Sequence, residues 1–185
     1  MDRASGYEPE GQEFESLRVR HTPPYLMKLN PDFITSLMGA ALEQAEMALG
    51  QNEVPVGAAI GYQDSILAVA ANRMEQGVDA SAHAEMLVMR QAAKQLGNWR
   101  LKDCVLCVTL EPCTMCAGAI RLSRVATVIY GASDPRAGAF GSLYDLSQDS
   151  RLGAPVRVIK GIEEERCSKV LKSFFTARRN QVPES

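Results

Sequence analysis

The chain has 185 residues, of which 46% are hydrophobic and 23% charged, and its formal net charge is -2 at pH 7. This length favours a single domain, and the composition excludes wholesale disorder and fibrous repeats. No apolar run approaches the roughly 18 residues of a membrane-spanning helix, so the sequence predicts a soluble protein.

The near-neutral total hides an uneven distribution of charge. Residues 1–90 carry 13 acidic and 6 basic side chains, whereas residues 91–185 carry 9 acidic and 14 basic ones. The first half therefore has a net charge of -7 and the second half one of +5. The basic second half is an indication of an anionic partner, because clustered positive charge attracts polyanions.

The first 30 residues predict a flexible extension. They mix Gly and Pro with acidic side chains, and they lack the apolar segment of a secretory signal. Their acidic residues also argue against an organelle transit peptide. Because no signal precedes the five cysteines, we expect a reducing compartment, the cytoplasm, where thiols ligate metals or fill cores rather than form disulfides.

The first helix, over residues 31–50, has the clearest boundaries. Asn30 is a suitable N-cap, Pro31 suits the first helical position, and Gly50 suits the end of a helix whose apolar residues recur at helical spacing. The remaining pattern predicts strands over 54–60 and 66–71 joined as a hairpin, a polar loop over 73–79, a helix over 81–97, a strand over 104–110, a helix over 112–122, a strand over 125–130, a loop with a short helix over 131–146, a strand over 155–160 and a helix over 163–180. Strands that alternate with helices indicate one α/β domain, over residues 31–182, with a largely buried sheet.

Two C-x-x-C pairs stand close together, Cys104 with Cys107 and Cys113 with Cys116. The first pair lies in a run with strand character, where residues three apart point to opposite faces, so it cannot reach one metal without breaking the strand. We therefore expect two buried core thiols there rather than half of a four-cysteine zinc site. The second pair follows Pro112 at a helix start, where its members share one face and the helix N-terminus lowers the pKa of a thiol.

His83 and Glu85 decide how the second C-x-x-C pair, Cys113 with Cys116, is interpreted. By itself, His83 is more often a core residue, Glu85 a solvated charge, and a lone C-x-x-C a redox dithiol. In the first turn of a helix, however, His83 and Glu85 can converge on a cavity beyond the helix tip. If the two helix N-termini face each other, His83, Cys113 and Cys116 ligate one zinc ion and leave its fourth position open, which is typical of a catalytic zinc.

The pattern H-x-E followed by P-C-x-x-C, with Cys113 30 positions after His83, is the signature of zinc-dependent nucleobase deaminases. The chemistry needs a carboxylate that is not a ligand. Glu85 is the expected catalytic residue: it takes the proton of the attacking water and passes it to a ring nitrogen and then to the leaving amine.

Beyond this motif, the sequence resembles the bacterial tRNA-specific adenosine deaminase family over roughly residues 33–180. The segments that carry the resemblance are EVPVGA at 53–58, NR at 72–73, AHAE at 82–85, VTLEPCTMCAGA at 108–119, YGASDPRAG at 130–138 with GSL at 141–143, and FF at 174–175 with RR at 178–179. The zinc motif alone fits cytidine, deoxycytidylate, guanine and pterin-precursor deaminases equally well. The loop around Asp134 and the FF…RR ending are the features that favour tRNA.

The resemblance implies a three-layer α/β/α fold of the cytidine-deaminase type around a five-stranded mixed sheet, with one zinc ion per subunit. It also implies conversion of the wobble adenosine of an arginine tRNA anticodon to inosine by a homodimer. By position, Asn72 matches the residue that hydrogen-bonds the target nucleoside, the backbone N–H of Ala84 faces the reacting centre, Val56 lines the base pocket, and Asp134 contacts the flanking nucleotides. Ordinary turns are the alternative for Asn72 and Asp134.

Basic side chains gather on the last helix, where residues 166–183 contain five bases and no acid. Lys169, Lys172, Arg178 and Arg179 are therefore candidates for contacts with the tRNA backbone, with a solvated helix face as the ordinary alternative. Two other functions stay open at this point. One is a deaminase of a free base or nucleotide, of the guanine or cytidine type, and the other is a zinc-binding or redox module without enzymatic activity.

Overall fold

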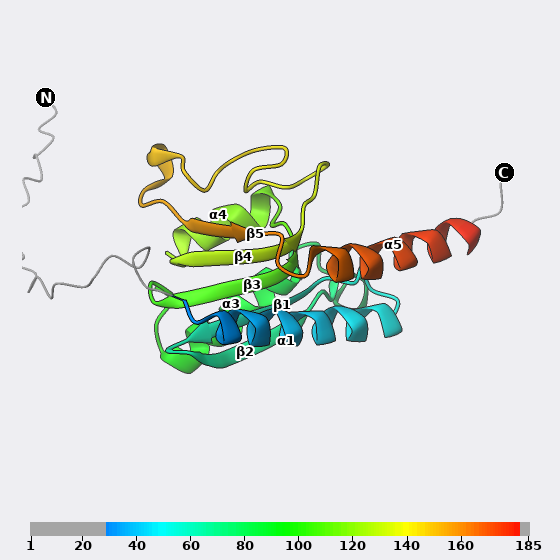
Figure 1. Cartoon of the computed structure of the whole chain (residues 1–185), viewed down its shortest axis with the longest axis horizontal. Coiled ribbons are helices and arrows are strands. Elements are labelled where there is room, and N and C mark those ends of the chain that lie inside the picture. Colours follow the sequence, from blue (N-terminus) through cyan, green and yellow to red (C-terminus); the bar gives the residue numbers. More distant parts are fainter. Residues whose placement is uncertain (1–28, 182–185) are drawn as a thin grey trace, which may run out of the picture.

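Five strands form one sheet, and helices cover both of its faces (Figure 1). The structure is a computed structural model that describes residues 29–181. Its strands are β1 Gly57–Tyr62, β2 Ser65–Ala71, β3 Cys104–Leu110, β4 Thr127–Ala132 and β5 Arg157–Lys160. Its helices are α1 Pro31–Gly50, α2 Met74–Gly77, α3 Ala84–Leu96, α4 Thr114–Leu122 and α5 Glu164–Gln181, with a short 3-10 helix η2 at Ser150–Leu152. Apart from Leu29 and Asn30, the expected extension over residues 1–30 lies outside the described residues.

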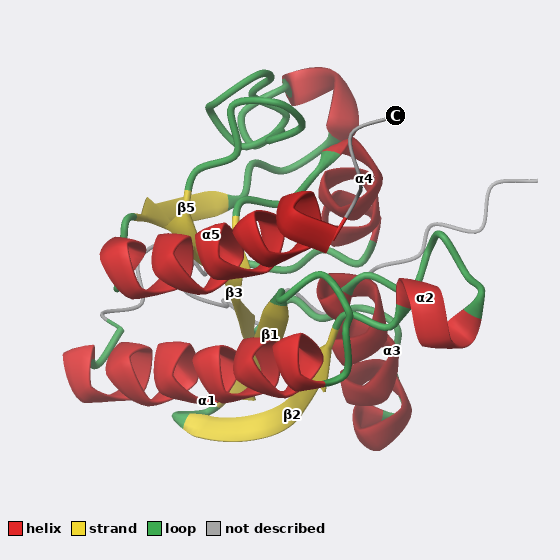
Figure 2. Cartoon of the chain, turned by 90° about the vertical axis from the view of Figure 1, so that its right-hand side faces the viewer, coloured by secondary structure: helices red, strands yellow, loops and turns green. Residues whose placement is uncertain are grey.

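The helices form two layers with the sheet between them (Figure 2). α1 and α5 lie side by side on one face, where α1 contacts β1, β2 and β3 and α5 contacts β4. α3 and α4 contact each other on the opposite face, and α3 packs on β1 and β2. The expected three-layer α/β/α fold with a five-stranded mixed sheet is therefore confirmed.

The strand order β2-β1-β3-β4-β5 decides where the functional loops meet. β1 pairs antiparallel with both β2 and β3, whereas β3, β4 and β5 run parallel to one another. The carboxyl ends of β3 and β4 therefore lie at the same edge of the sheet, and the segments that follow them come together there.

Helix α1 has the predicted boundaries for the predicted reasons. Asn30 has extended backbone angles and its side chain accepts a hydrogen bond from the backbone N–H of Asp32, as an N-cap does. The helix ends at Gly50, and it buries one apolar face against the sheet. The end of α3 is also as predicted, because Gly97 takes the left-handed conformation that glycine adopts most readily.

The other elements differ from the predicted ranges mainly at the starts of the functional helices. α3 begins at Ala84 and α4 at Thr114, so His83 and Cys113 are N-caps with extended backbones rather than first-turn residues. Cys113 also pairs with Gly138 across an isolated bridge, and such pairing requires an extended backbone. A short helix, α2, lies within the expected polar loop, and β1 begins at Gly57 rather than at residue 54.

The short helix expected within residues 131–146 is wrong. This segment is a loop with a single hydrogen bond of the helical type, from the backbone N–H of Gly138 to the carbonyl of Asp134, which is not continued into a helix. Ala139 N–H donates to the carbonyl of Pro112, and Leu146 N–H donates to that of Ala139. The loop therefore has its conformation because it packs against the start of α4.

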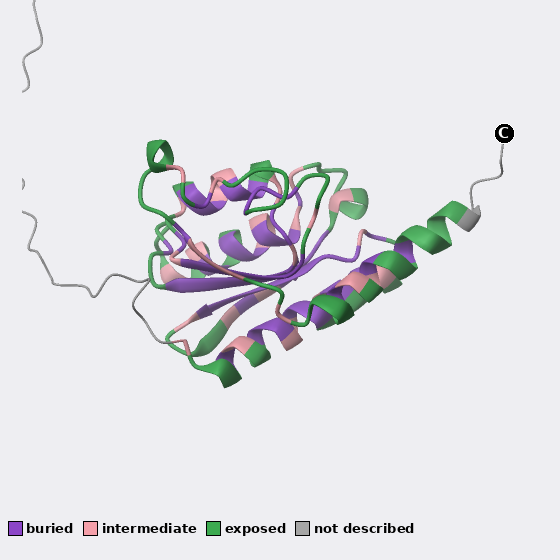
Figure 3. Ribbon diagram, turned by 45° about the horizontal axis from the view of Figure 1, so that its top comes forward, coloured by how far each residue is buried: buried purple, intermediate pink, exposed green. Residues whose placement is uncertain are grey.

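The hydrophobic core follows the sheet and the helix faces that cover it (Figure 3). Its largest fully buried side chains include Tyr130, Leu106 and Ile129 in the central strands. The outer part of α5, from Phe175 to Arg179, extends beyond this core and is exposed. None of the helices between residues 29 and 181 combines the length and apolar character that crossing a bilayer requires.

Candidate functional site

Three ligand side chains meet where the N-termini of α3 and α4 approach each other. His83 caps α3, Cys113 caps α4, and Cys116 lies in the first turn of α4. One ligand atom from each of the three lies within 4.8 Å of the other two. In the described part of the chain, this is the one group of three or more such side chains placed closely enough to hold a metal ion. The structure thus brings together the three predicted ligands.

The distances within this group fit a tetrahedral zinc ion. His83 Nδ1 lies 3.7 Å from the sulfur of Cys113 and 3.5 Å from that of Cys116. Zinc–sulfur bonds of about 2.3 Å and zinc–nitrogen bonds of about 2.0 Å at tetrahedral angles separate nitrogen from sulfur by about 3.5 Å. The nitrogen that faces both sulfurs is Nδ1, so Nδ1 is the ligand atom of His83. Three protein ligands leave the fourth position open, which is the coordination of a catalytic zinc.

The electrostatics of the group also favour a cation. A hydrogen bond from the Cys116 thiol lowers the pKa of Cys113, which favours the thiolate form of Cys113. The same hydrogen bond raises the pKa of Cys116. The hydrogen bond with Cys113 raises the pKa of His83. A zinc ion replaces the protons that these ligands otherwise share, because metal ligation requires deprotonated thiols and a neutral imidazole.

Glu85 lies beside this group but has a different environment. It is the second residue of α3 and is buried, with 3% of its surface exposed. Its carboxylate lies close enough to Cys116 for each of the two groups to shift the pKa of the other. Burial raises the pKa of Glu85, because desolvation penalises the charged form. A buried carboxylate with a raised pKa, next to a metal site with an open position, is a suitable group to accept and return a proton.

The remaining cysteines belong to the core, as predicted for Cys104 and Cys107. Both lie in β3 and are fully buried, and burial raises their pKa values, that of Cys104 to about 11. Cys167 is buried on the inner face of α5, where its sulfur lies 3.8 Å from that of Met38. All five cysteines are free thiols.

The residues expected around the target base are buried near the start of β1 and the end of β2. Asn72 follows β2 directly, and its side-chain amide donates a hydrogen bond to Glu53, which also accepts one from the backbone of Gln76. The backbone N–H of Asn72 donates to the carbonyl of Val56. The carboxylate of Glu53 therefore fixes the orientation of the Asn72 side chain. Glu53 belongs to the EVPVGA segment, but the spacing of 19 residues between it and Asn72 did not predict this contact.

Ala84 is the first residue of α3, between His83 and Glu85. The backbone N–H at that position has no acceptor within its own helix. It is therefore placed to donate a hydrogen bond at the helix tip, as the resemblance implies.

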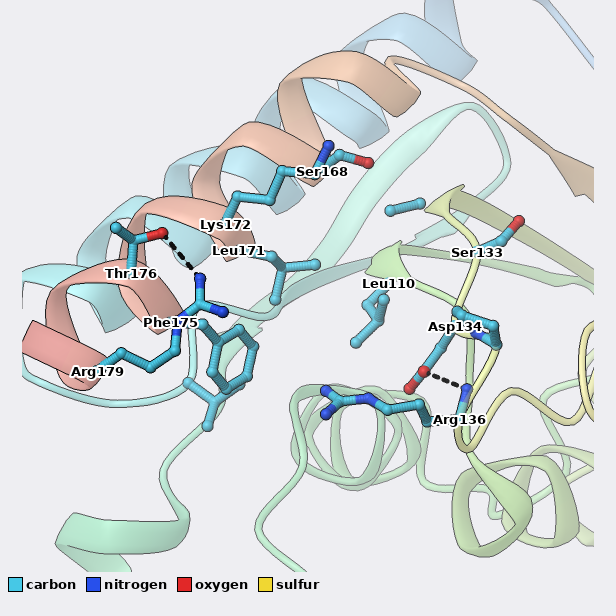
Figure 4. A pocket seen from close by; sticks show the side chains of 13 residues that line it. Leu110, Ser133, Asp134, Arg136, Ser168, Leu171, Lys172, Phe175, Thr176 and Arg179 are labelled. Atoms are coloured by element: carbon cyan, nitrogen blue, oxygen red, sulfur yellow. Dashed lines mark hydrogen bonds between the residues drawn. The ribbon is translucent and has the colours of Figure 1, made fainter. Parts of the chain in front are cut away.

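A groove of about 710 Å³ opens between the loop after β4 and helix α5 (Figure 4). Ser133, Asp134 and Arg136 form the loop side, and Lys172, Phe175 and Arg179 are among the residues on the α5 side (Figure 4). The guanidinium of Arg136 lies 5.8 Å from the centre of the Phe175 ring, so the two sides approach each other across the groove.

Of the four predicted basic residues of α5, two line the groove and two lie outside it. Lys172 and Arg179 line the groove, whereas Lys169 does not and Arg178 lies over the ring of Phe174 at 5.2 Å. All four are exposed. Arg136 also lines the groove but was not among the predicted contacts, although it lies in the YGASDPRAG segment that carried the resemblance.

This chain is similar in sequence to known deaminases and to a deaminase family model. Residues 32–132 match the family model of the cytidine and deoxycytidylate deaminase zinc-binding region. The tRNA-specific adenosine deaminase of Bacillus subtilis is 44% identical over 144 residues, which cover 78% of this chain and 89% of that protein. The enzyme of the same name from Haemophilus influenzae is 39% identical over 155 residues, covering 83% of this chain and 90% of that one.

Solved structures agree with these relatives. A structure from a study of A-to-I editing by tRNA:A34 deaminases at the wobble position matches with a TM-score of 0.72 and 38% identity, over 74% of this chain and 99% of that one. A guanine deaminase from Nitrosomonas europaea matches with a TM-score of 0.64 over 80% of this chain and 94% of that one. Its identity is 21%, which supports a shared fold alone.

The ligand assignment predicts which cysteines zinc needs. Cys113→Ala or Cys116→Ala removes a ligand, so the purified protein is expected to fall from about one zinc per chain to a small fraction of that. Cys104→Ala combined with Cys107→Ala changes two core thiols of β3 and is expected to keep the full zinc content. Inductively coupled plasma mass spectrometry of the folded variants measures this. Loss of zinc from the β3 double variant contradicts the assignment.

Proposed function

The chain belongs to the tRNA-specific adenosine deaminases, within the zinc-binding cytidine and deoxycytidylate deaminase family, and we propose that it hydrolyses the wobble adenosine of a tRNA anticodon to inosine. The reaction consumes one water and releases one ammonia for each adenosine converted. The arginine tRNA is the proposed substrate, on the resemblance described above.

The observation that carries this function is the combination of an open three-ligand zinc site with a buried carboxylate next to it. When bound, zinc lowers the pKa of a water molecule and so makes a nucleophile available near neutral pH. Glu85 then has two roles at its carboxylate oxygens. It accepts the proton of the attacking water, and it donates that proton to the ring nitrogen and later a proton to the leaving amine. A structural zinc module has no need of such a carboxylate.

The surrounding residues are proposed to hold the base in place. Asn72, oriented by Glu53, hydrogen-bonds the target nucleoside, and Val56 forms an apolar wall of the base pocket. The backbone N–H of Ala84 faces the reacting centre. A base must leave its stack to reach a recessed site, which suits the single-stranded loop of an anticodon.

Replacing the proposed proton carrier tests the mechanism. Glu85→Gln keeps the shape of the side chain but cannot accept the proton, so the rate of inosine formation in an anticodon stem-loop is expected to fall by about 100-fold or more. Zinc content is expected to stay at the wild-type value, because Glu85 is not a ligand. Nucleoside analysis of the digested RNA measures inosine. A variant that retains zinc and full activity refutes the role of Glu85, and wild-type activity on free guanine or cytidine but not on the stem-loop supports the alternative substrate class.

The groove between the 133–142 loop and α5 is the proposed site for the nucleotides that flank the target. Asp134 contacts these nucleotides from the loop side, and Lys172 and Arg179 reach their phosphates from the α5 side. Lys169 and Arg178 lie outside the groove but are exposed on the same helix, and they are proposed to contact the tRNA backbone beyond it.

The salt dependence of binding tests the groove. Lys172→Ala combined with Arg179→Ala is expected to weaken binding of the stem-loop and to reduce the slope of log affinity against log salt by about 0.7 for each lost phosphate contact. Lys94→Ala combined with Lys102→Ala removes the same amount of charge. Lys94 lies near the C-terminus of α3 and Lys102 just before β3, away from the groove, so this pair is expected to leave the affinity and the slope unchanged. Fluorescence anisotropy titrations at several salt concentrations measure them. If the two double variants weaken RNA binding equally, the groove is not part of the RNA interface.

We also propose a homodimer that forms through the outer face of α4. Met115 and Leu122 lie seven residues apart, on one side of this helix, with 37% and 77% of their surfaces exposed. Trp99, which is 53% exposed, lies nearby, since its ring is 6.0 Å from the guanidinium of Arg124 just beyond α4. Exposed apolar side chains that gather in this way are typical of an interface.

A charge on this face is expected to separate the subunits. Leu122→Glu buries a carboxylate in the proposed contact and should convert a dimer into a monomer at micromolar concentration. Met47→Glu, on the outer surface of α1, is the matched control and should leave the dimer intact. Sedimentation velocity measures both. A monomeric wild-type protein refutes the proposal.

The cytoplasm is the proposed location, because the substrate is tRNA and all five cysteines are free thiols. Cell fractionation with an antibody to the protein tests this. The deaminase domain is proposed to span residues 31–182, with residues 1–30 as its extension.

A further inference from the structure

A second buried carboxylate, Glu111, lies directly before Pro112 and the zinc ligand Cys113. Only 2% of its surface is exposed. Neither of the two ion pairs found among the described residues involves it. A buried carboxylate needs hydrogen-bond donors to offset its desolvation, so its partners indicate what it does.

All four donors to Glu111 come from the 133–142 loop. Oε1 accepts hydrogen bonds from the backbone N–H groups of Phe140 and Ser142, each at 3.0 Å. Oε2 accepts one from the backbone N–H of Asp134 at 3.1 Å and another from the hydroxyl of Ser142. One side chain therefore holds both ends of a loop that lies more than twenty residues further along the chain.

The loop approaches this carboxylate so closely that it has no room for a side chain at one point. A Cβ atom at Gly138 would collide with the Glu111 carboxylate and with the carbonyl of Asp134. The same glycine pairs with Cys113 across an isolated bridge. The loop is thus attached to the zinc turn through the backbone as well as through Glu111.

This loop also forms one side of the groove described above. Asp134, between Ser133 and Arg136 on the groove wall, donates its backbone N–H to Glu111. In Figure 4 the Asp134 carboxylate accepts from the backbone N–H of Arg136, at 2.9 Å. Displacement of the Glu111 carboxylate would therefore move the groove wall without removing a zinc ligand or Glu85.

We propose that Glu111 is a positioning residue that holds the 133–142 loop against the zinc turn and so fixes the wall of the groove that binds the nucleotides flanking the target base. The identity of that ligand rests on the proposed function; the hold on the loop does not. The groove contributes to binding of the RNA and not to the chemical step. Loss of the hydrogen bonds between Glu111 and the loop therefore affects KM more than kcat.

Two measurements on the zinc-loaded full chain test this role. Glu111→Gln replaces one acceptor oxygen with an NH₂ group, so at least one of the four donors loses its acceptor. Amide hydrogen exchange in residues 134–142 is expected to become about tenfold faster or more, and KM for the anticodon stem-loop to rise by about tenfold, with a smaller change in kcat and no change in zinc. Ser142→Ala, which removes one donor only, is expected to give smaller changes in the same direction.

Glu53→Gln is the matched control for hydrogen exchange, since Glu53 is an equally buried carboxylate that holds Asn72 and Gln76 instead of the loop. It should leave exchange in residues 134–142 at the wild-type rate. The role of Glu111 is refuted if Glu111→Gln leaves exchange and KM unchanged, if it loses zinc in proportion to activity, or if kcat alone falls. A wild-type protein inactive on the stem-loop refutes the proposed function instead, and the exchange rates then still decide whether Glu111 holds the loop.

Discussion

The site depends on two helix N-termini that have to come within bonding range of a single ion. His83 and Cys113 are 30 residues apart in the chain, yet their ligand atoms are 3.7 Å apart. This proximity follows from the sheet, in which β3 leads into α4 while α3 packs against β1, the neighbour of β3. The ligands are N-caps or first-turn residues, so the packing of α3 and α4 determines where their backbones lie.

The same geometry separates the three ligands from Glu85, the proposed proton carrier. Glu85 is two residues beyond His83 at the start of α3, and it is buried beside Cys116 rather than turned to solvent. Burial raises its pKa, and this suits a group that has to exchange a proton near neutral pH. An exposed carboxylate at the same helix position would contribute to helix stability through the dipole but would stay ionised and ineffective as an acid.

Recognition of a larger substrate requires the site to continue into a second surface. The groove along α5 is the proposed surface, with Lys172 and Arg179 on the helix and Asp134 on the loop. The loop has little regular structure of its own, and its shape depends on hydrogen bonds to Glu111 and on its bridge to Cys113. Metal site and groove are therefore both attached to one short segment, Glu111-Pro112-Cys113, which connects the metal site with the proposed binding surface for flanking nucleotides.

Local signals in the sequence determined the elements and the chemical class. Helix α1 was predictable from its cap and apolar spacing, and strand β3 with its buried thiols from the alternation of faces. The His, Glu and Cys residues were predictable as a set because their types and spacing answer the needs of one reaction. Each of these predictions used residues that are close together along the chain.

Only the tertiary structure decided what depends on contacts between distant segments. The sequence predicted a short helix within residues 131–146, but the backbone N–H groups of Ala139 and Phe140 donate to the carbonyl of Pro112 and the carboxylate of Glu111, between β3 and α4, instead of continuing a helix. The division of the basic residues of α5, with Lys172 and Arg179 on the groove and Arg178 over Phe174, likewise depends on how the helix packs. Spacing along one chain specifies the period of a helix or strand, whereas the partner of a buried polar group is specified by the elements that the fold brings next to it.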